Sequence, residues 1–221
     1  MLRWQMMVLV AVVALAMRAP VAAQDATPTA DRQENTHLVD PAECSAKPVD
    51  TAKITQMLGL DGNGVPAPAK HTLTPPLGLL TDAATAKAID AVTREIIACY
   101  NAQDVARSAV LMTEQGFQRA FWELTVDQAS RERTKQLLTA KPQPRDNDAL
   151  IRLVAATDPV VLADNRVASF VVLDEPLLPP DGPETLLFIF AKQDATWRFD
   201  DLVDFTVVPP SATPQAATPT S

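Results

Sequence analysis

The 221-residue chain has little of the chemistry on which most catalytic and metal sites depend. It contains 2 histidines, 2 cysteines, 1 tyrosine and 6 glycines. Two cysteines cannot form a four-ligand zinc site, and His37 and His71 both lie outside the expected core. A Ser-His-Asp arrangement and a histidine-based metal site therefore lack their central residue. No glycine-centred run of oxygen ligands suggests a calcium loop. We expect no metal and no cofactor.

Basic residues are also scarce, with 19 Lys and Arg against 27 Asp and Glu, a formal charge of -8. Nucleic acid is therefore not an expected partner, because phosphate binding draws on clustered Lys and Arg. Hydrophobic residues make up 47% of the chain, which is enough for a core and excludes disorder throughout. The length suits one domain with extensions, or two very small domains.

The first residues have the pattern of a secretory signal peptide. Arg3 precedes an apolar run over residues 6–17, and small residues lead to Ala23. The run is shorter than the ~20 residues of a spanning helix, so no stable membrane span is expected after cleavage. Removing residues 1–23 leaves 17 basic against 27 acidic residues, a formal charge of -10. We expect a secreted or cell-surface-associated protein.

Composition divides the remaining chain into three parts. Residues 24–80 are an N-terminal extension with a short helix over 49–58 and a Pro/Gly-rich linker over 61–76. Residues 81–208 are the main domain. Residues 209–221 form a Pro/Thr tail, expected to be disordered as a flexible end or as a glycosylated stalk.

The main domain is predicted to place helices first and strands afterwards. Asp82 caps a helix with apolar residues at helical spacing, Asp104 caps residues 105–112, and Thr113 starts a third helix. Thr125 and Gln128 fit a capping box for a fourth helix to about residue 138. Strands follow over 150–157, 166–173, 185–192 and 197–208. This order predicts an α+β fold with a curved antiparallel sheet around helices.

Three segments resemble the nuclear transport factor 2-like superfamily and its SnoaL-like members. Residues 91–113, AVTREIIACYNAQDVARSAVLMT, are similar to its first helix pair, with Asn101 and Asp104 at the turn and Gln103 in place of the usual glycine. Residues 162–173, LADNRVASFVVL, and 186–205, LLFIFAKQDATWRFDDLVDF, resemble its hairpins. The resemblance covers about residues 83–208. It implies a cone-shaped, cystatin-like fold around a pocket.

The resemblance also bears on catalysis. Family isomerases carry a tyrosine where this chain has Ile96, and a general-base aspartate where it has residues 116–121 without a carboxylate. Tyr100 lies one turn past Ile96 and is a poor replacement. The carboxylates of Asp200, Asp201 and Asp204 would serve as acid or base only with a raised pKa. As ordinary surface charge they would face solvent or Arg198.

Several residues are candidates to line the cone, although the aromatic ones could equally be core. The candidates are Ile96, Tyr100, Phe117, Phe121, Trp122, Phe170 and Asp204. Cys44 and Cys99 are expected to form a disulfide, because two cysteines in an exported chain tend to pair. The alternative is two separate thiols, with Cys99 buried and Cys44 exposed.

Two functions remain open. The first is an exported, non-catalytic module that binds a small apolar ligand or a protein partner, with a homodimer through the sheet face. The second is a SnoaL-like isomerase or hydrolase acting on a small organic substrate, with Asp204 and Tyr100 as its acid-base set. The first function is favoured because no histidine lies in the expected core and because Ile96 stands where family isomerases have a tyrosine. We therefore expect no catalytic residue.

Overall fold

A sheet and a set of helices make up the described part of the chain. The structure is a computed structural model that describes residues 37–68, 78–176 and 182–204. The predicted signal peptide, the tail and residues 69–77 of the linker lie outside these ranges. All described residues belong to one unit, Thr36–Ser221. Every strand pair is antiparallel, which confirms the predicted α+β class.

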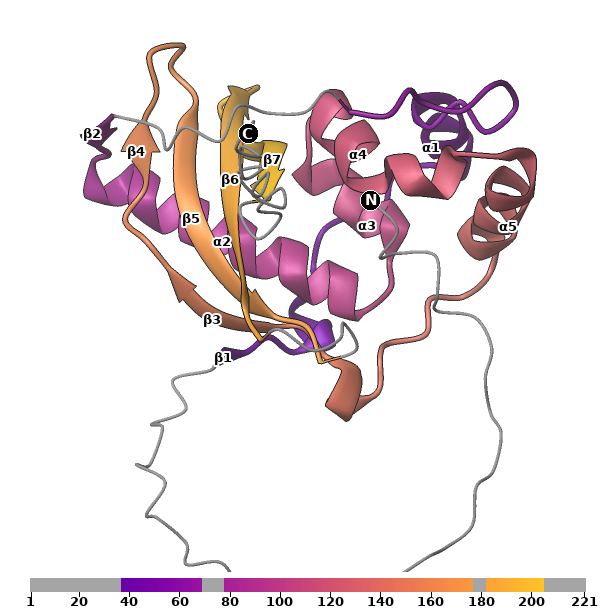
Figure 1. The fold of residues 1–221 in the computed structure, drawn as a ribbon, viewed down its shortest axis with the longest axis horizontal. Helices are drawn as coiled ribbons and strands as arrows, with labels where there is room; N and C mark the ends of the chain where they lie inside the picture. Colours follow the sequence, from indigo (N-terminus) through magenta and orange to yellow (C-terminus); the bar gives the residue numbers. More distant parts are fainter. Residues whose placement is uncertain (1–36, 69–77, 177–181, 205–221) are drawn as a thin grey trace, which may run out of the picture. The chain divides into compact units, whose positions relative to one another are not determined.

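The described sheet has seven strands (Figure 1). They are β1 (His37–Leu38), β2 (Leu79–Leu80), β3 (Arg152–Ala156), β4 (Val160–Val161), β5 (Val167–Asp174), β6 (Glu184–Gln193) and β7 (Thr196–Asp204). One side of β5 pairs with β6, and β6 pairs with β7. The other side of β5 pairs with β3 and β4, which follow each other along it. Beyond them, β1 pairs with β3 and β2 with β4.

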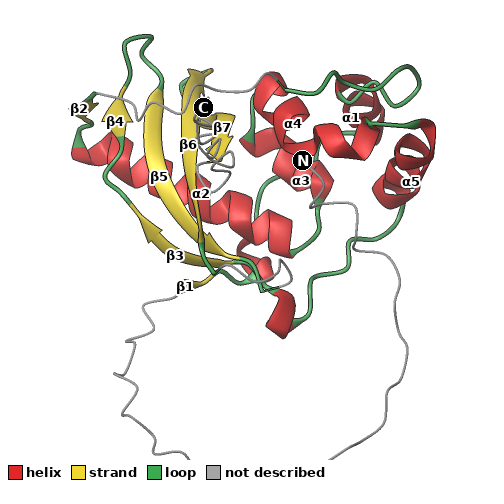
Figure 2. Ribbon diagram, viewed as in Figure 1, coloured by secondary structure: helices red, strands yellow, loops and turns green. Residues whose placement is uncertain are grey.

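Five α-helices are described (Figure 2). They are α1 (Thr51–Met57), α2 (Ala83–Asn101), α3 (Val105–Ser108), α4 (Glu114–Phe121) and α5 (Gln128–Thr139). Helix α2 crosses one face of the sheet, and the other four gather on the β7 side (Figure 1). The predicted caps Asp82, Asp104 and Thr113 are confirmed, because each side chain accepts a backbone N–H from the first turn of its helix.

Two helix predictions need correction. The capping box at Thr125 is wrong: Thr125 ends a 3₁₀ turn, Trp122–Thr125, and its hydroxyl donates to the Trp122 carbonyl at 2.8 Å. The cap of α5 is Asp127, whose Oδ1 accepts from the Ser130 N–H at 2.7 Å. The helix predicted over 105–112 is split into α3 and a 3₁₀ turn, Ala109–Leu111.

The strand predictions hold for β3, β5, β6 and the described part of β7. Asn165 lies in the turn before β5, and Asp194 and Ala195 form the turn between β6 and β7; their φ values are 66°, 49° and 64°. Strands β1, β2 and β4 were not predicted, because two residues are too few to show an alternating pattern. Pro159 lies between β3 and β4 and has no N–H to extend the ladder.

The core lies between α2, α4 and the sheet. Phe117 and Phe190 are fully buried there, and the rings of Phe188 and Phe199 are 5.2 Å apart between centroids. Residues of the N-terminal extension, Val39 and Ile54 among them, belong to the same apolar cluster. A search of the described residues for helices long and apolar enough to cross a membrane found none.

Candidate functional site

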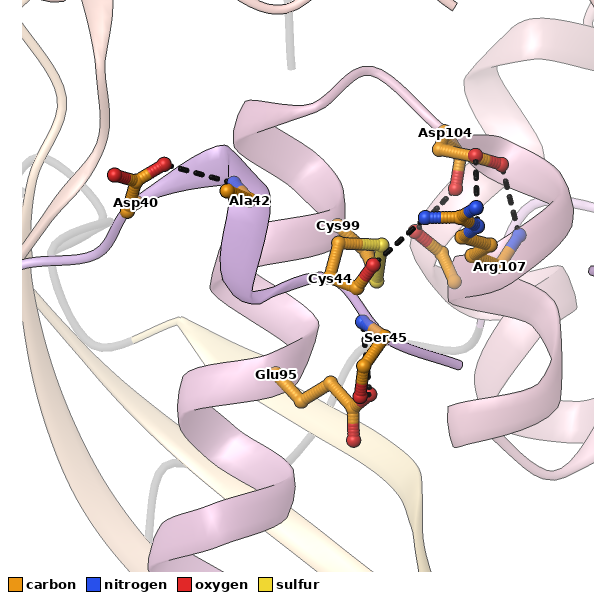
Figure 3. The surroundings of a disulfide bond; sticks show 9 residues. Asp40, Ala42, Cys44, Ser45, Glu95, Cys99, Asp104 and Arg107 are labelled. Atoms are coloured by element: carbon orange, nitrogen blue, oxygen red, sulfur yellow. Dashed lines mark hydrogen bonds and ion pairs between the residues drawn. A yellow bond between two sulfur atoms is a disulfide. The ribbon is translucent and has the colours of Figure 1, made fainter. Parts of the chain in front are cut away.

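A disulfide joins the N-terminal extension to α2 (Figure 3). Cys44 and Cys99 are bonded and buried, which confirms the predicted pair. The Arg107 Nη1 donates to the Cys44 carbonyl at 2.7 Å, and the Ser45 hydroxyl donates to Glu95 of α2 at 2.7 Å. The extension is therefore held to α2 by the disulfide and the Ser45–Glu95 hydrogen bond, and to α3 by the Arg107 hydrogen bond.

Asn101, at the turn that carries the family resemblance, makes a second connection. Its side chain is fully buried. The Nδ2 donates to the carbonyls of Val39 and Ile151 at 2.9 and 3.0 Å, and the Oδ1 accepts from the Ile151 N–H at 2.9 Å. One amide thus joins the extension, the end of α2 and the start of β3. The role of Asn101 is to hold these segments together.

The predicted cone-lining residues are divided between two apolar clusters and the ends of elements. Ile96, Phe117 and Phe121 are buried in the main core, where the rings of Phe117 and Phe121 are 4.9 Å apart between centroids. Phe170 packs against a second cluster made by Ala168, Leu187, Ile189 and Val203. This cluster lies on the other face of the sheet, since these positions alternate with those of the main core.

The other candidates lie at the ends of elements. Trp122 is half-buried at the start of the 3₁₀ turn after α4, and Asp204 pairs with Leu186 at the end of β7. The Tyr100 ring lies near Phe121 and carries the Arg145 guanidinium at 5.0 Å from its centroid. An acid-base role for Asp204 with Tyr100 stays a prediction.

The hydroxyl of Tyr100 is buried and stays protonated near neutral pH. Burial, together with the nearby charge of Glu175, raises the pKa of its hydroxyl, and the charge of Arg145 offsets part of this rise. Arg145 is itself engaged, because its Nη1 contacts Glu175 Oε1 at 2.8 Å. The raised pKa keeps Tyr100 neutral.

Two carboxylates of β7 face arginines other than the expected Arg198. Asp200 is the extra residue at a bulge between β6 and β7; it accepts from the Thr113 hydroxyl at 2.7 Å and pairs with Arg166 at 3.0 Å. Asp201 is buried and pairs with Arg119 of α4. These contacts attach α4 and the β4–β5 turn to β7.

One pocket lies between the first half of α2 and the break between β3 and β4. It has a volume of about 280 Å³ and is lined by residues of α2 from Ala86 to Thr93, by residues 156–159 and by Ser169. None of the predicted cone-lining residues borders it. Within the described ranges, no group of three or more His, Cys, Asp or Glu side chains is placed to hold a metal ion.

The sheet ends on exposed leucines at β2. Two cross-strand rows run through the sheet and terminate there: Leu79, Val161, Val167, Phe190 and Phe199 on the helix side, and Leu80, Val160, Ala168, Ile189 and Asp201 on the other side. The members on β5, β6 and β7 are buried, Val160 is half-buried and Val161 is 37% exposed. Leu79 and Leu80 are 82% and 70% exposed. The first row is apolar throughout and the second is apolar as far as Asp201 on β7, and both end in solvent at β2, an edge strand of the described sheet.

Sequence reasoning missed both features. The pocket depends on Lys87, Asp90 and Asp158, which look like ordinary surface charges in the sequence. Pro159 was the available signal, because a proline inside an apolar run indicates a break in a strand. The Leu79-Leu80 pair lies next to the Pro/Gly-rich linker and was assigned to the extension.

Comparison of the chain with protein-family models, curated proteins and solved structures found no match.

Proposed function

We propose that the chain is an exported, non-catalytic module of the nuclear transport factor 2-like type that binds an extended segment of a partner polypeptide along β2. The observation that carries this proposal is the exposure of Leu79 and Leu80 at the end of two largely apolar rows. An added strand would continue both rows and pair with the backbone of β2.

The fold assignment is supported by the turn after α2. The family pattern has a glycine where this chain has Gln103, and Gln103 has a φ of 53°, in the left-handed region that glycine adopts most readily. Asp104 then caps α3, as its place in the pattern requires. A helix packed across an antiparallel sheet agrees with the cone-shaped arrangement that the resemblance implies.

Export is supported by the pattern of residues 1–23 and by the disulfide. Disulfides persist in oxidising compartments and are rare in the cytosol of most organisms. The Cys44–Cys99 bond joins residues 55 positions apart and lies within the core, so it is part of the fold.

A non-catalytic role is supported by how the acid-base candidates are engaged. Ile96 packs in the core, and the carboxylates of Asp200 and Asp201 are each paired with an arginine. A general base must instead offer a lone pair to its substrate. The aromatic residues of the interior pack on one another, so the proposal places binding at the edge of the sheet and not inside it.

The occupant is an extended polypeptide with adjacent apolar residues and flanking basic residues. Adjacent apolar residues are needed because Leu79 and Leu80 point to opposite faces of the sheet. Basic flanks are favoured because the exposed Asp82 and Asp158 lie beside the leucines, and the chain after residue 23 carries a formal charge of -10. Gly78 allows β2 to approach β4, since a Cβ there would collide with the Val161 carbonyl oxygen.

The test uses the chain from residue 24 and a labelled peptide of about ten residues with two central leucines between lysines. Fluorescence anisotropy should show saturable binding that weakens as salt is added. The Leu79→Ser/Leu80→Ser double variant should bind about tenfold more weakly or worse. The matched control is Leu137→Ser, which changes a leucine that is 61% exposed on α5 and should leave binding unchanged.

Three results would contradict the proposal. The first is equal binding by the double serine variant and the parent chain. The second is equal binding of a peptide N-methylated at both leucines, because such a peptide cannot donate backbone hydrogen bonds to β2. The third is a dimer in sedimentation that the double variant converts to a monomer, because the occupant of the edge would then be a second copy of the chain.

A further inference from the structure

The pocket beside α2 has a floor that accepts hydrogen bonds. Thr93 and Ser169 border it and are 2% and 3% exposed. The Thr93 hydroxyl donates to the Ile89 carbonyl at 2.9 Å, and the Ser169 hydroxyl donates to the Thr157 carbonyl at 2.7 Å. Because each hydroxyl hydrogen is already used, only oxygen lone pairs remain for a ligand. The floor therefore favours a group that donates.

Charges of both signs border the same pocket. Lys87 and Asp90 lie three residues apart on α2, and Asp158 lies across from them at the break between β3 and β4. Among the described residues none of the three takes part in an ion pair, although they border one pocket. All three charged groups are exposed and are therefore free to meet a ligand.

Apolar side chains complete the pocket. Ile89 and Pro159 are buried, and Ala86 and Ala156 lie beside them. The volume of about 280 Å³ is slightly below the range of roughly 300–1,000 Å³ that is usual for drug-sized ligands. A ligand here is small, with a short apolar body and charged groups directed to the rim.

We propose that this pocket binds a free α-amino acid with a small aliphatic side chain. Its ammonium group would donate to Asp90, Asp158 and the hydroxyl floor, and its carboxylate would lie against Lys87. The side chain would pack on Ile89 and Pro159. A ligand with one charge would leave either the lysine or the two aspartates unused, whereas a zwitterion engages all three. This site is separate from the β2 edge and does not depend on the proposed function.

The test is a titration of the chain from residue 24 with L-valine and two analogues of similar shape, followed by calorimetry and amide NMR. Isobutylamine lacks the carboxylate, and isovalerate lacks the ammonium group. Valine should bind saturably and shift the amide signals of Thr93 and Ser169. Each analogue should bind about tenfold more weakly or worse, since it loses one charge-assisted contact.

Substitutions of charged residues test which of them bind the ligand. Lys87→Met and Asp158→Asn should each weaken valine binding about tenfold without changing the denaturation midpoint. Lys53→Met and Asp148→Asn are the matched controls, because both residues are exposed and lie outside the pocket. Absence of valine binding would overturn the proposal. So would analogues as tight as valine, or equal weakening by the pocket and control variants.

Discussion

Tyr100 and Asn101 are adjacent in the chain but have different roles. Asn101 uses both ends of its amide on backbone groups of Val39 and Ile151, so a substitution would leave buried partners without hydrogen bonds. Tyr100 is the one tyrosine of the chain, packed under Arg145. That makes its ionisation directly observable in the whole protein.

Tyr100 should ionise only far above its ordinary pKa of about 10 while the protein is folded, because burial disfavours the phenolate. Ultraviolet absorbance should show no tyrosinate at pH 10, whereas the urea-unfolded chain should titrate near that value. A folded protein that titrates like the unfolded chain would show that the hydroxyl is accessible to solvent.

The same shift has a consequence for stability. The free energy of unfolding is unaffected by Tyr100 ionisation below the pKa of tyrosine in the unfolded chain. It falls as the pH rises above about 10, because only the unfolded chain then releases the Tyr100 proton. The Tyr100→Phe variant should therefore lose less stability than the parent between pH 9 and 11. Denaturant midpoints across this range measure the difference, and parallel curves for the two proteins would contradict it.

At the scale of elements, the fit of α4 on β7 depends on one small residue. Gly116 lies where a Cβ would collide with the Phe199 carbonyl oxygen, and that oxygen accepts from the Thr113 N–H at 2.8 Å. The Thr113 hydroxyl accepts from the Gly116 N–H and donates to Asp200. Helix α4 therefore approaches the bulge of β7 more closely than a larger residue would allow.

The Gly116→Ala variant should be destabilised by about 1–3 kcal/mol, because α4 has to move away from β7. The higher helix propensity of alanine would give the opposite sign at an unconstrained position. Urea unfolding measures the change. The control is Gln115→Ala on the exposed side of the same helix, which should change stability by less than about 0.5 kcal/mol. A stabilised Gly116→Ala variant would show that α4 is not packed this closely.

Predictability from sequence also differs between elements. Helix α2 was predictable because its apolar residues recur at helical spacing. Strands β5 and β6 were predictable because each contains a continuous apolar run. Strands β1, β2 and β4 have two residues each and depend on partners far away in the chain. The predicted cap at Thr125 was wrong because the capping-box spacing is also met by a residue ending a 3₁₀ turn.

At the scale of the whole molecule, the disulfide decides how the N-terminal extension is held. It was predictable from the cysteine count and the signal-peptide pattern. The pocket and the exposed edge were not. The pocket joins α2 to the β3–β4 break, and the edge joins β2 to β4, in each case across more than 60 positions of the chain.

Removing the disulfide with Cys44→Ser and Cys99→Ala should cost roughly 4 kcal/mol, the chain-entropy value for a loop of this length. Guanidinium unfolding of the oxidised parent and of the double variant gives the difference. Limited proteolysis should cut the variant first within residues 40–50, because only noncovalent contacts would then hold that segment. These contacts include hydrogen bonds from Arg107 and to Glu95, the Arg94–Glu43 ion pair and the Val49–Ala106 backbone hydrogen bond. A loss below about 1 kcal/mol would mean that the remaining contacts suffice.

Amide hydrogen exchange of the chain from residue 24, with and without the leucine peptide, tests the central claim of edge binding most directly. The account predicts that amides of β2 exchange readily in the free protein and become protected when the peptide is added, while those of α5 stay unchanged. Protection of β2 already complete in the free protein, or peptide-induced protection confined to other elements, would contradict it.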